Sequence, residues 1–204
     1  MIHEIRTSHL KPGNLERYIE IVQPVIEQRV ELSHLIGYFH TEIGPLNRVI
    51  HIWQYEDVKE RDAIRAKADE IPGWPPATGE LIEKMHSEIY VPAPFLPDLD
   101  ITRNIGPLFE LRAYTYPPGA IPSVIDAWST RIEKRMELSQ PVGIWYSEFG
   151  QLNRWLHMWA YESLEHRKEA RQSFGSIGWP PPSSSKPIEQ ENILLSALPF
   201  SPVQ

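Results

Sequence analysis

The chain repeats itself over almost its whole length. When it is shifted by 106 positions, residues 2–71 lie over residues 108–177 without a gap, and 24 of these 70 pairs are identical. Deleting one further residue aligns Gly-Trp-Pro-Pro at 73–76 with the same four residues at 178–181. Two long copies are too few for a solenoid, so the pattern predicts a tandem duplication of one folded unit.

A proline-rich segment separates the two copies. Prolines stand at positions 92, 94, 97 and 107, which favours an extended, semi-rigid connection. We therefore expect one unit over residues 1–98, a linker over residues 99–106 and a second unit over residues 107–204.

Each copy shows the element order β-α-β-β-α-β. Alternation over residues 2–9 predicts a strand, and apolar residues at helical spacing over 15–30, repeated over 121–136, predict a helix. Residues 36–43 and 47–55 predict a hairpin, a helix follows the caps Asp57 and Ser163, and residues 85–91 predict a last strand. Short connections and right-handed crossovers fold this α+β order into a ferredoxin-like unit with both helices on one face.

Alternation along the strands sorts the side chains into two faces. In the strand at 47–55, Ile50 and Ile52 share an apolar face. The opposite face carries His51, Trp53 and Tyr55. We expect the apolar face to lie under the helices. An exposed aromatic face of this size needs a cover, and the same face of the other copy can provide it. The two sheets would then pair as a dimeric α/β barrel within one chain, with a polar and aromatic interior.

Two segments resemble a known family. Residues 38–56 (YFHTEIGPLNRVIHIWQYE) and residues 4–13 (EIRTSHLKPG) are similar to the NIPSNAP signature, and the second copy keeps much of it. The resemblance covers both copies and implies the α/β barrel fold. It implies little chemistry, because the eukaryotic members are known as partner-binding proteins in vesicle traffic and mitochondrial quality control.

The predicted polar and aromatic face supplies the candidate ligand-binding residues. An arginine fork can hold a carboxylate, a histidine can move protons near neutral pH, and indole or phenol rings can stack on a flat ligand. The same residues are equally suited to a satisfied structural network. The candidates are Glu4, Arg6, Glu42, Asn47, His51, Trp53 and Tyr55 in the first copy, and Glu110, Arg112, Glu148, Asn153, His157, Trp159 and Tyr161 in the second.

Composition narrows the function further. The chain has no cysteine, which excludes disulfides and thiolate metal sites, and the spacing of His40, Glu42 and His51 matches no strong metal motif, so we expect no metal and no cofactor. A net charge of -7 argues against nucleic acid as a partner. No apolar run approaches the roughly 20 residues of a membrane span. We expect a cytoplasmic homo-oligomer.

Two hypotheses follow for function, and no motif decides whether the protein is an enzyme. The first is binding or turnover of a small organic metabolite, aromatic or carboxylate in character, inside the barrel. The alternative is a partner-binding or structural homo-oligomeric module without catalysis, which uses the Trp-Pro-Pro loops and the proline-rich arms.

Overall fold

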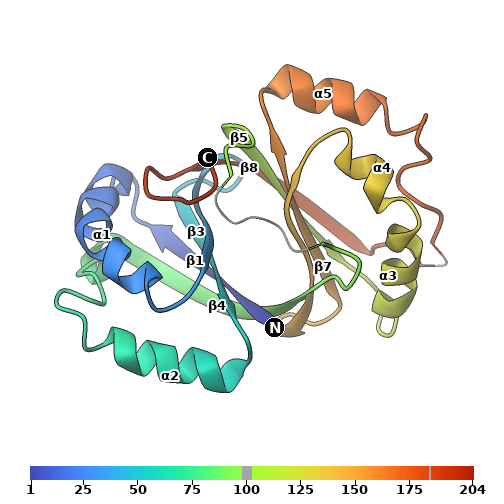
Figure 1. Cartoon of the computed structure of the whole chain (residues 1–204). Helices are drawn as coiled ribbons and strands as arrows, with labels where there is room; N and C mark the ends of the chain where they lie inside the picture. Colours follow the sequence, from blue (N-terminus) through green and yellow to red (C-terminus); the bar gives the residue numbers. More distant parts are fainter. Residues whose placement is uncertain (98–102, 184) are drawn as a thin grey trace.

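The computed structural model describes residues 1–97, 103–183 and 185–204 (Figure 1). The first repeat contains β1 (Ile2–Leu10), α1 (Leu15–Val30), β2 (Leu35–Ile43), β3 (Arg48–Tyr55), α2 (Val58–Ala68), the 3₁₀ turn Gly79–Leu81 and β4 (Ile82–Pro92). The second contains β5 (Leu108–Thr115), α3 (Ile121–Ser129), α4 (Ile132–Met136), β6 (Pro141–Phe149), β7 (Arg154–Tyr161), α5 (Leu164–Gln172) and β8 (Glu189–Ala197). Positions 99–102 of the predicted linker lie outside the described residues.

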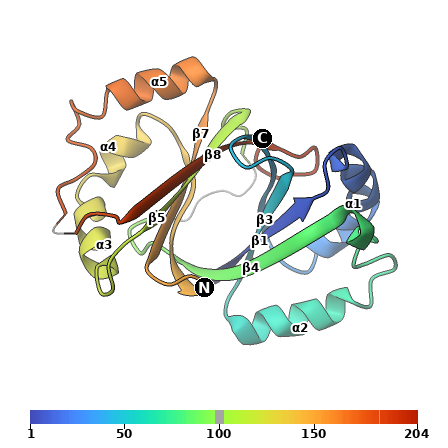
Figure 2. The same ribbon diagram turned by 180° about the vertical axis from the view of Figure 1, so that it is seen from behind.

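The strands close into one antiparallel barrel in the order β1-β3-β2-β8-β5-β7-β6-β4. Each repeat contributes four neighbouring strands, and the two sheets join where β2 pairs with β8 and β4 pairs with β6. Figures 1 and 2 show the helices of the two repeats outside the sheets on opposite flanks. The predicted α+β barrel of two repeats within one chain is therefore confirmed.

Local signals explain where the helices begin and break. Asp57 Oδ1 accepts a hydrogen bond from the Glu60 backbone N–H at 2.8 Å, and Ser163 caps α5 in the same way, as predicted. The single helix expected over 121–136 is instead two short helices. The hydroxyls of Ser129 and Thr130 donate back to the carbonyls of Asp126 and Ala127, each at 2.7 Å, which competes with continuation of the helix.

The assignment of the two sheet faces was wrong. The barrel interior holds the apolar rows, including Ile50, Ile52, Leu156 and Met158. The face with His51, Trp53 and Tyr55 lies under the helices instead, where Trp53 and Tyr55 pack in one cluster with Tyr18, Val22 and Ile26 of α1. Their counterparts Trp159 and Tyr161 pack in a cluster with residues of α3 and α4.

Polar satisfaction explains this inversion. The interior of a closed barrel is bounded by paired backbone on every side, so polar groups there must find partners within the same narrow space, as Trp145 and His3 do with each other. The helices can bring polar side chains over the outer face: Arg29 of α1 donates to the Tyr55 hydroxyl at 2.9 Å. The polar and aromatic rows therefore face the helices, and the apolar rows pack against each other between the two sheets.

The arms that follow β4 and β8 are exchanged between the repeats. Ala93, Phe95 and Leu96, which follow β4, pack in the helix-side cluster of repeat 2. Leu198 and Phe200, which follow β8, pack in the cluster of repeat 1. The Ala93 N–H donates to the Ile144 carbonyl at 2.9 Å and the Leu198 N–H to the Tyr38 carbonyl at 2.8 Å. Each repeat thus completes the outer core of its twin.

A single methyl group at Gly143 should disturb the barrel core. A Cβ there would overlap the ring of Trp145, which is fully buried and donates through Nε1 to His3 Nδ1 at 2.7 Å. Overpacking costs about 1–3 kcal/mol, and displacing the indole adds the lost hydrogen bond. We expect Gly143→Ala to lower the free energy of unfolding by about 3 kcal/mol in urea titrations. Gly175→Ala, where a Cβ meets nothing within 4 Å, should stay within about 0.5 kcal/mol of the parent; equal losses would contradict this packing.

Candidate functional site

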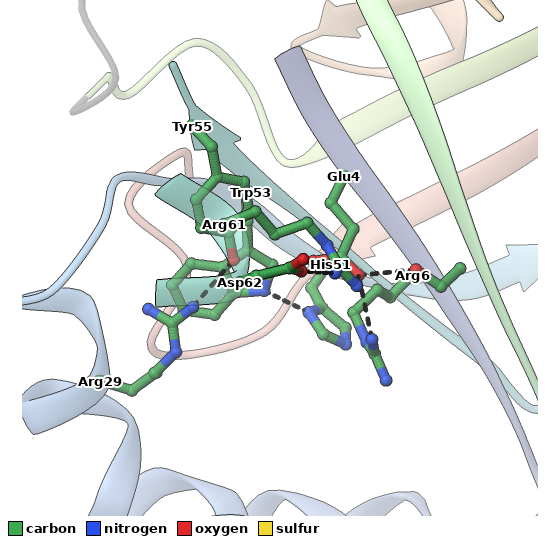
Figure 3. Close-up of polar contacts among 9 residues, drawn as sticks. Glu4, Arg6, Arg29, His51, Trp53, Tyr55, Arg61 and Asp62 are labelled. Carbon is green, nitrogen blue, oxygen red and sulfur yellow. Dashed lines mark hydrogen bonds and ion pairs between the residues drawn. The ribbon is translucent and has the colours of Figure 1, made fainter. Parts of the chain in front are cut away.

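A fully buried glutamate organises the polar face of each repeat. In repeat 1, Glu4 Oε1 accepts from Arg6 at 3.0 Å, from Arg61 of α2 at 2.7 Å and from Ser87 at 2.6 Å (Figure 3). Burial alone would raise the pKa of Glu4, but the hydrogen bonds from Arg61 and Ser87 outweigh it and hold the pKa at about 2. The Glu4 carboxylate is therefore a charged part of the structure at neutral pH.

Repeat 2 repeats this arrangement around Glu110. Its Oε1 accepts from Arg112 at 2.8 Å, from Arg167 of α5 at 2.6 Å and from Asn192 at 3.2 Å. Buried charges are tolerated when they are paired in this way. Arg61 and Arg167 are thus the closest cationic partners of the two buried carboxylates.

A histidine and a tryptophan on β3 form a hydrogen-bonded pair that recurs on β7. The indole Nε1 of Trp53 donates to His51 Nδ1 at 2.6 Å, and Trp159 donates to His157 at 2.7 Å. Burial lowers the pKa of His51 to about 3 and the pKa of His157 well below its usual value. Because an indole can only donate, each neutral ring carries its proton on Nε2. These imidazoles are hydrogen-bond donors at neutral pH and do not carry a charge.

A buried arginine on each first helix was missed by sequence reasoning. Arg29 of α1 and Arg135 of α4 are 3% and 1% exposed, respectively. Arg135 donates to Ser139 Oγ at 2.7 Å and to the Tyr161 hydroxyl at 3.0 Å, and its guanidinium lies 3.7 Å from the centre of the Trp159 ring. The available signal was an arginine on the apolar stripe of the helix at the same place in both copies.

Some predicted site residues lie apart from these networks. Glu42 and Glu148 are exposed near the ends of β2 and β6. Asn47 and Asn153 lie in the hairpin turns with φ of 57° and 59°, a left-handed conformation that asparagine tolerates better than most residues. Their recurrence in both copies is explained by the turn, so the predicted grouping of these four residues on one inner face with Glu4, Arg6 and His51 was wrong.

A cavity of about 580 Å³ lies between the sheet and the helices of repeat 2. Its lining comes from β5, β7, all three helices of the repeat and the segment that begins at Trp179. The predicted candidates Glu110, Arg112, His157, Trp159 and Tyr161 all line it. Sequence reasoning missed the other main lining residues, which are Tyr114, Tyr116, Trp128, Arg135, Arg171, Phe174, Trp179, Lys186 and Gln190.

The cavity is aromatic and electropositive. Arg112, Arg135, Arg171 and Lys186 line it together with a single carboxylate, Glu110, which is already held by Arg112 and Arg167. Trp128 and Trp179 meet edge to face with ring centres 4.6 Å apart. Flat apolar walls with an excess of cationic donors suit a small organic anion.

Two negative findings apply to the described parts of the chain. His40 and Glu42 approach to 3.5 Å, but no group of three or more potential metal ligands comes together among the described residues. Within the same residues, no helix is long and apolar enough to cross a membrane.

Comparison with known proteins gives one consistent match. The family model NIPSNAP matches residues 3–97 and 109–202. The chain is 28% identical over 213 residues to human Protein NipSnap homolog 3B, covering 99% of this chain and 85% of that protein. It is 29% identical over 173 residues to a NipSnap homolog of Dictyostelium discoideum, covering 83% and 74%. A solved structure from Lactobacillus acidophilus, described as a putative monooxygenase, superposes with a TM-score of 0.65 at 12% identity, covering 95% of this chain and 92% of that one, which is a likeness of fold.

Proposed function

We propose that this chain, which belongs to the NIPSNAP family, binds or turns over a small organic metabolite, aromatic or carboxylate in character. The site is the cavity of repeat 2 between sheet and helices, in place of the barrel interior suggested by the sequence. The barrel interior is lined by an apolar cluster that includes Phe39, Phe109 and Trp145. The observation that carries the proposal is the cavity itself, large enough for a ligand and lined by aromatic rings and four cationic side chains.

Native mass spectrometry of the chain purified from cells tests this proposal. We expect a small-molecule adduct at one equivalent. Gln190→Trp, at a cavity-lining position on β8, should remove the adduct by filling the space. Met85→Trp is the matched control. Met85 on β4 pairs with Ser8 on β1, and Gln190 on β8 pairs with Tyr114 on β5, so the two positions correspond in the two repeats. The proposal fails if the adduct is absent and no aromatic or carboxylate metabolite raises the melting temperature, or if Gln190→Trp leaves the adduct unchanged.

A second candidate function is a partner-binding or homo-oligomeric module. The observation that favours it is exposed apolar residues on both hairpins: Ile43, Leu46, Phe149 and Leu152 are 56–65% exposed. The Trp-Pro-Pro loops support it less, since Trp74 and Trp179 pack against the cores of their own repeats. Light scattering on the Leu46→Ser, Leu152→Ser double variant distinguishes this function from metabolite binding. If the protein is a homo-oligomeric module, the parent forms an oligomer and the double variant does not.

We further propose that each repeat is a ferredoxin-like unit and that the units divide near residues 98 and 107. The spatial strand orders β4-β1-β3-β2 and β8-β5-β7-β6 support this division.

A further inference from the structure

We infer that the ligand of the repeat 2 cavity is an aromatic acid bound as its anion, one per chain, and that His157 and Arg135 recognise its carboxylate. This inference rests on the proposed function and names the ligand class and the repeat that binds it. It starts from the polar atoms that line the cavity and have no partner.

Two buried nitrogens at the cavity lack hydrogen-bond partners in the described structure: His157 Nε2 and Arg135 Nε. His157 is 4% exposed, and its Nδ1 is occupied by the Trp159 indole, so Nε2 carries the proton and can only donate. The Arg135 Nε–H is likewise a donor. Both side chains contact Trp159: His157 accepts a hydrogen bond from the indole Nε1, and the Arg135 guanidinium lies over the indole ring. A ligand oxygen that reaches either nitrogen would satisfy that donor.

The charge of Arg135 makes the missing acceptor an anion. Among the described residues, Arg135 forms no ion pair, and it donates to the neutral hydroxyls of Ser139 and Tyr161. A guanidinium that is 1% exposed loses most of its hydration and is stabilised by a counter-charge. The single carboxylate in the lining, Glu110, is committed to Arg112 and Arg167. The same surplus of positive charge disfavours a cationic ligand, although aromatic walls alone would accept one.

The walls select an aromatic body. Trp179 meets two other indoles edge to face, with ring centres 4.6 Å from Trp128 and 6.5 Å from Trp159. Phe174 lies on the same cavity, and the Arg135 guanidinium is 4.8 Å from its ring centre. Flat rings that meet at steep angles leave slots that a planar ring fills better than a puckered one.

Repeat 1 has the same buried histidine, tryptophan and arginine, but the residues around them differ. Its His51 is covered by Tyr38, stacked at 4.6 Å with an interplanar angle of 10°. Residues Val22 and Ala68 stand at the positions of Trp128 and Phe174. We therefore assign one binding site to the chain, although the sequence repeats the candidate residues twice.

Isothermal titration with three probes tests the ligand class. We expect 1-naphthoate to bind with one site per chain. The neutral isostere 1-naphthamide and the saturated cyclohexanecarboxylate should each bind at least about tenfold more weakly, because they lack the charge or the flat ring. A naphthamide affinity equal to that of naphthoate, or two equivalent sites, would overturn the inference.

A matched pair of variants tests the residues. His157→Phe and His51→Phe remove the same indole-imidazole hydrogen bond, one in each repeat. We expect the first to weaken naphthoate binding by about tenfold or more and the second by less than about twofold. Equal losses would overturn the assignment to repeat 2. If His157→Phe does not fold, as judged by near-UV circular dichroism, Trp128→Val replaces it with the same expected loss.

The two proposals fail differently. If none of the probes binds while the cellular adduct persists in native mass spectrometry, the aromatic-acid inference is wrong and the metabolite-binding function stands. If the adduct is also absent, the proposed function fails with it.

Discussion

A chain cut to residues 1–97 should not exist as a folded monomer. Strands β2 and β4 would lose their partners β8 and β6, and so become open edges. The inner face with Ile5, Phe39 and Ile50, which is buried against the second sheet, would be exposed to water. The outer core would lose Leu198 and Phe200 from the exchanged arm. The full chain supplies all of these contacts internally.

Circular dichroism and size-exclusion light scattering test this expectation. Residues 1–97 alone should be unfolded or should associate in pairs, with one copy supplying the edges that the second repeat normally provides. Mixing residues 1–97 with residues 107–204 should restore a 1:1 complex with a cooperative melting transition. A native-like, cooperative monomer of either fragment would show that the barrel is not required for folding of the unit.

Acidification from pH 7.5 to pH 5 should remove much of the stability of the protein. Burial lowers the pKa of His51 to about 3, the pKa of His3 to about 4, and the pKa of His157 well below its usual value. Below pH 6.5 the unfolded chain takes up protons at these histidines while the folded chain does not, so the free energy of unfolding falls as the pH falls. At pH 5 each histidine costs about 2 kcal/mol. Glu4, whose pKa is lowered to about 2, adds a further loss below pH 4.5 in the same direction.

Urea titrations at pH 7.5, 6 and 5 measure this loss. His51→Gln should reduce the proton uptake on unfolding near pH 5 by about one, because it removes one titrating group that the folded state keeps neutral. The exposed His34 offers a control, and His34→Gln should leave the steep fall of stability in place. A free energy of unfolding that is the same at pH 7.5 and pH 5 would contradict the burial of three neutral imidazoles.

Most of the local structure was readable from the sequence because its causes are local. The repeat predicted two units, and period-two and helical patterns predicted the strands and most helices. The caps at Asp57 and Ser163 form as expected. Two local features were missed: the break between α3 and α4, and the turn role of Asn47 and Asn153, whose positive φ explains their recurrence without any ligand.

The candidate site was only partly predictable because its residues come from different elements. Alternation placed His157, Trp159 and Tyr161 on one face, and these residues do share the cavity. Arg135, Trp128 and Phe174 reach the same cavity from helices and a loop, and no spacing along the chain links them to β7. The aromatic walls of the repeat 2 cavity depend on residues such as Trp128 and Phe174, which repeat 1 replaces with Val22 and Ala68. These residues are far apart along the chain, so the sequence does not show that they line one cavity.

From the sequence alone followed the two copies of one unit, the strands and most helices of each copy, and which side chains of β3 and β7 share a face. These follow from the repeat and from backbone periodicity. The three-dimensional packing was needed to show which face lies inside the barrel, how the arms are exchanged and that repeat 2 has a cavity. In β3 and β7 both faces are buried, one against the other sheet and one against helices, so alternation in these strands has no exposed side to identify. The choice depends instead on where buried charges find partners: Arg61 of α2 binds Glu4, and Arg167 of α5 binds Glu110.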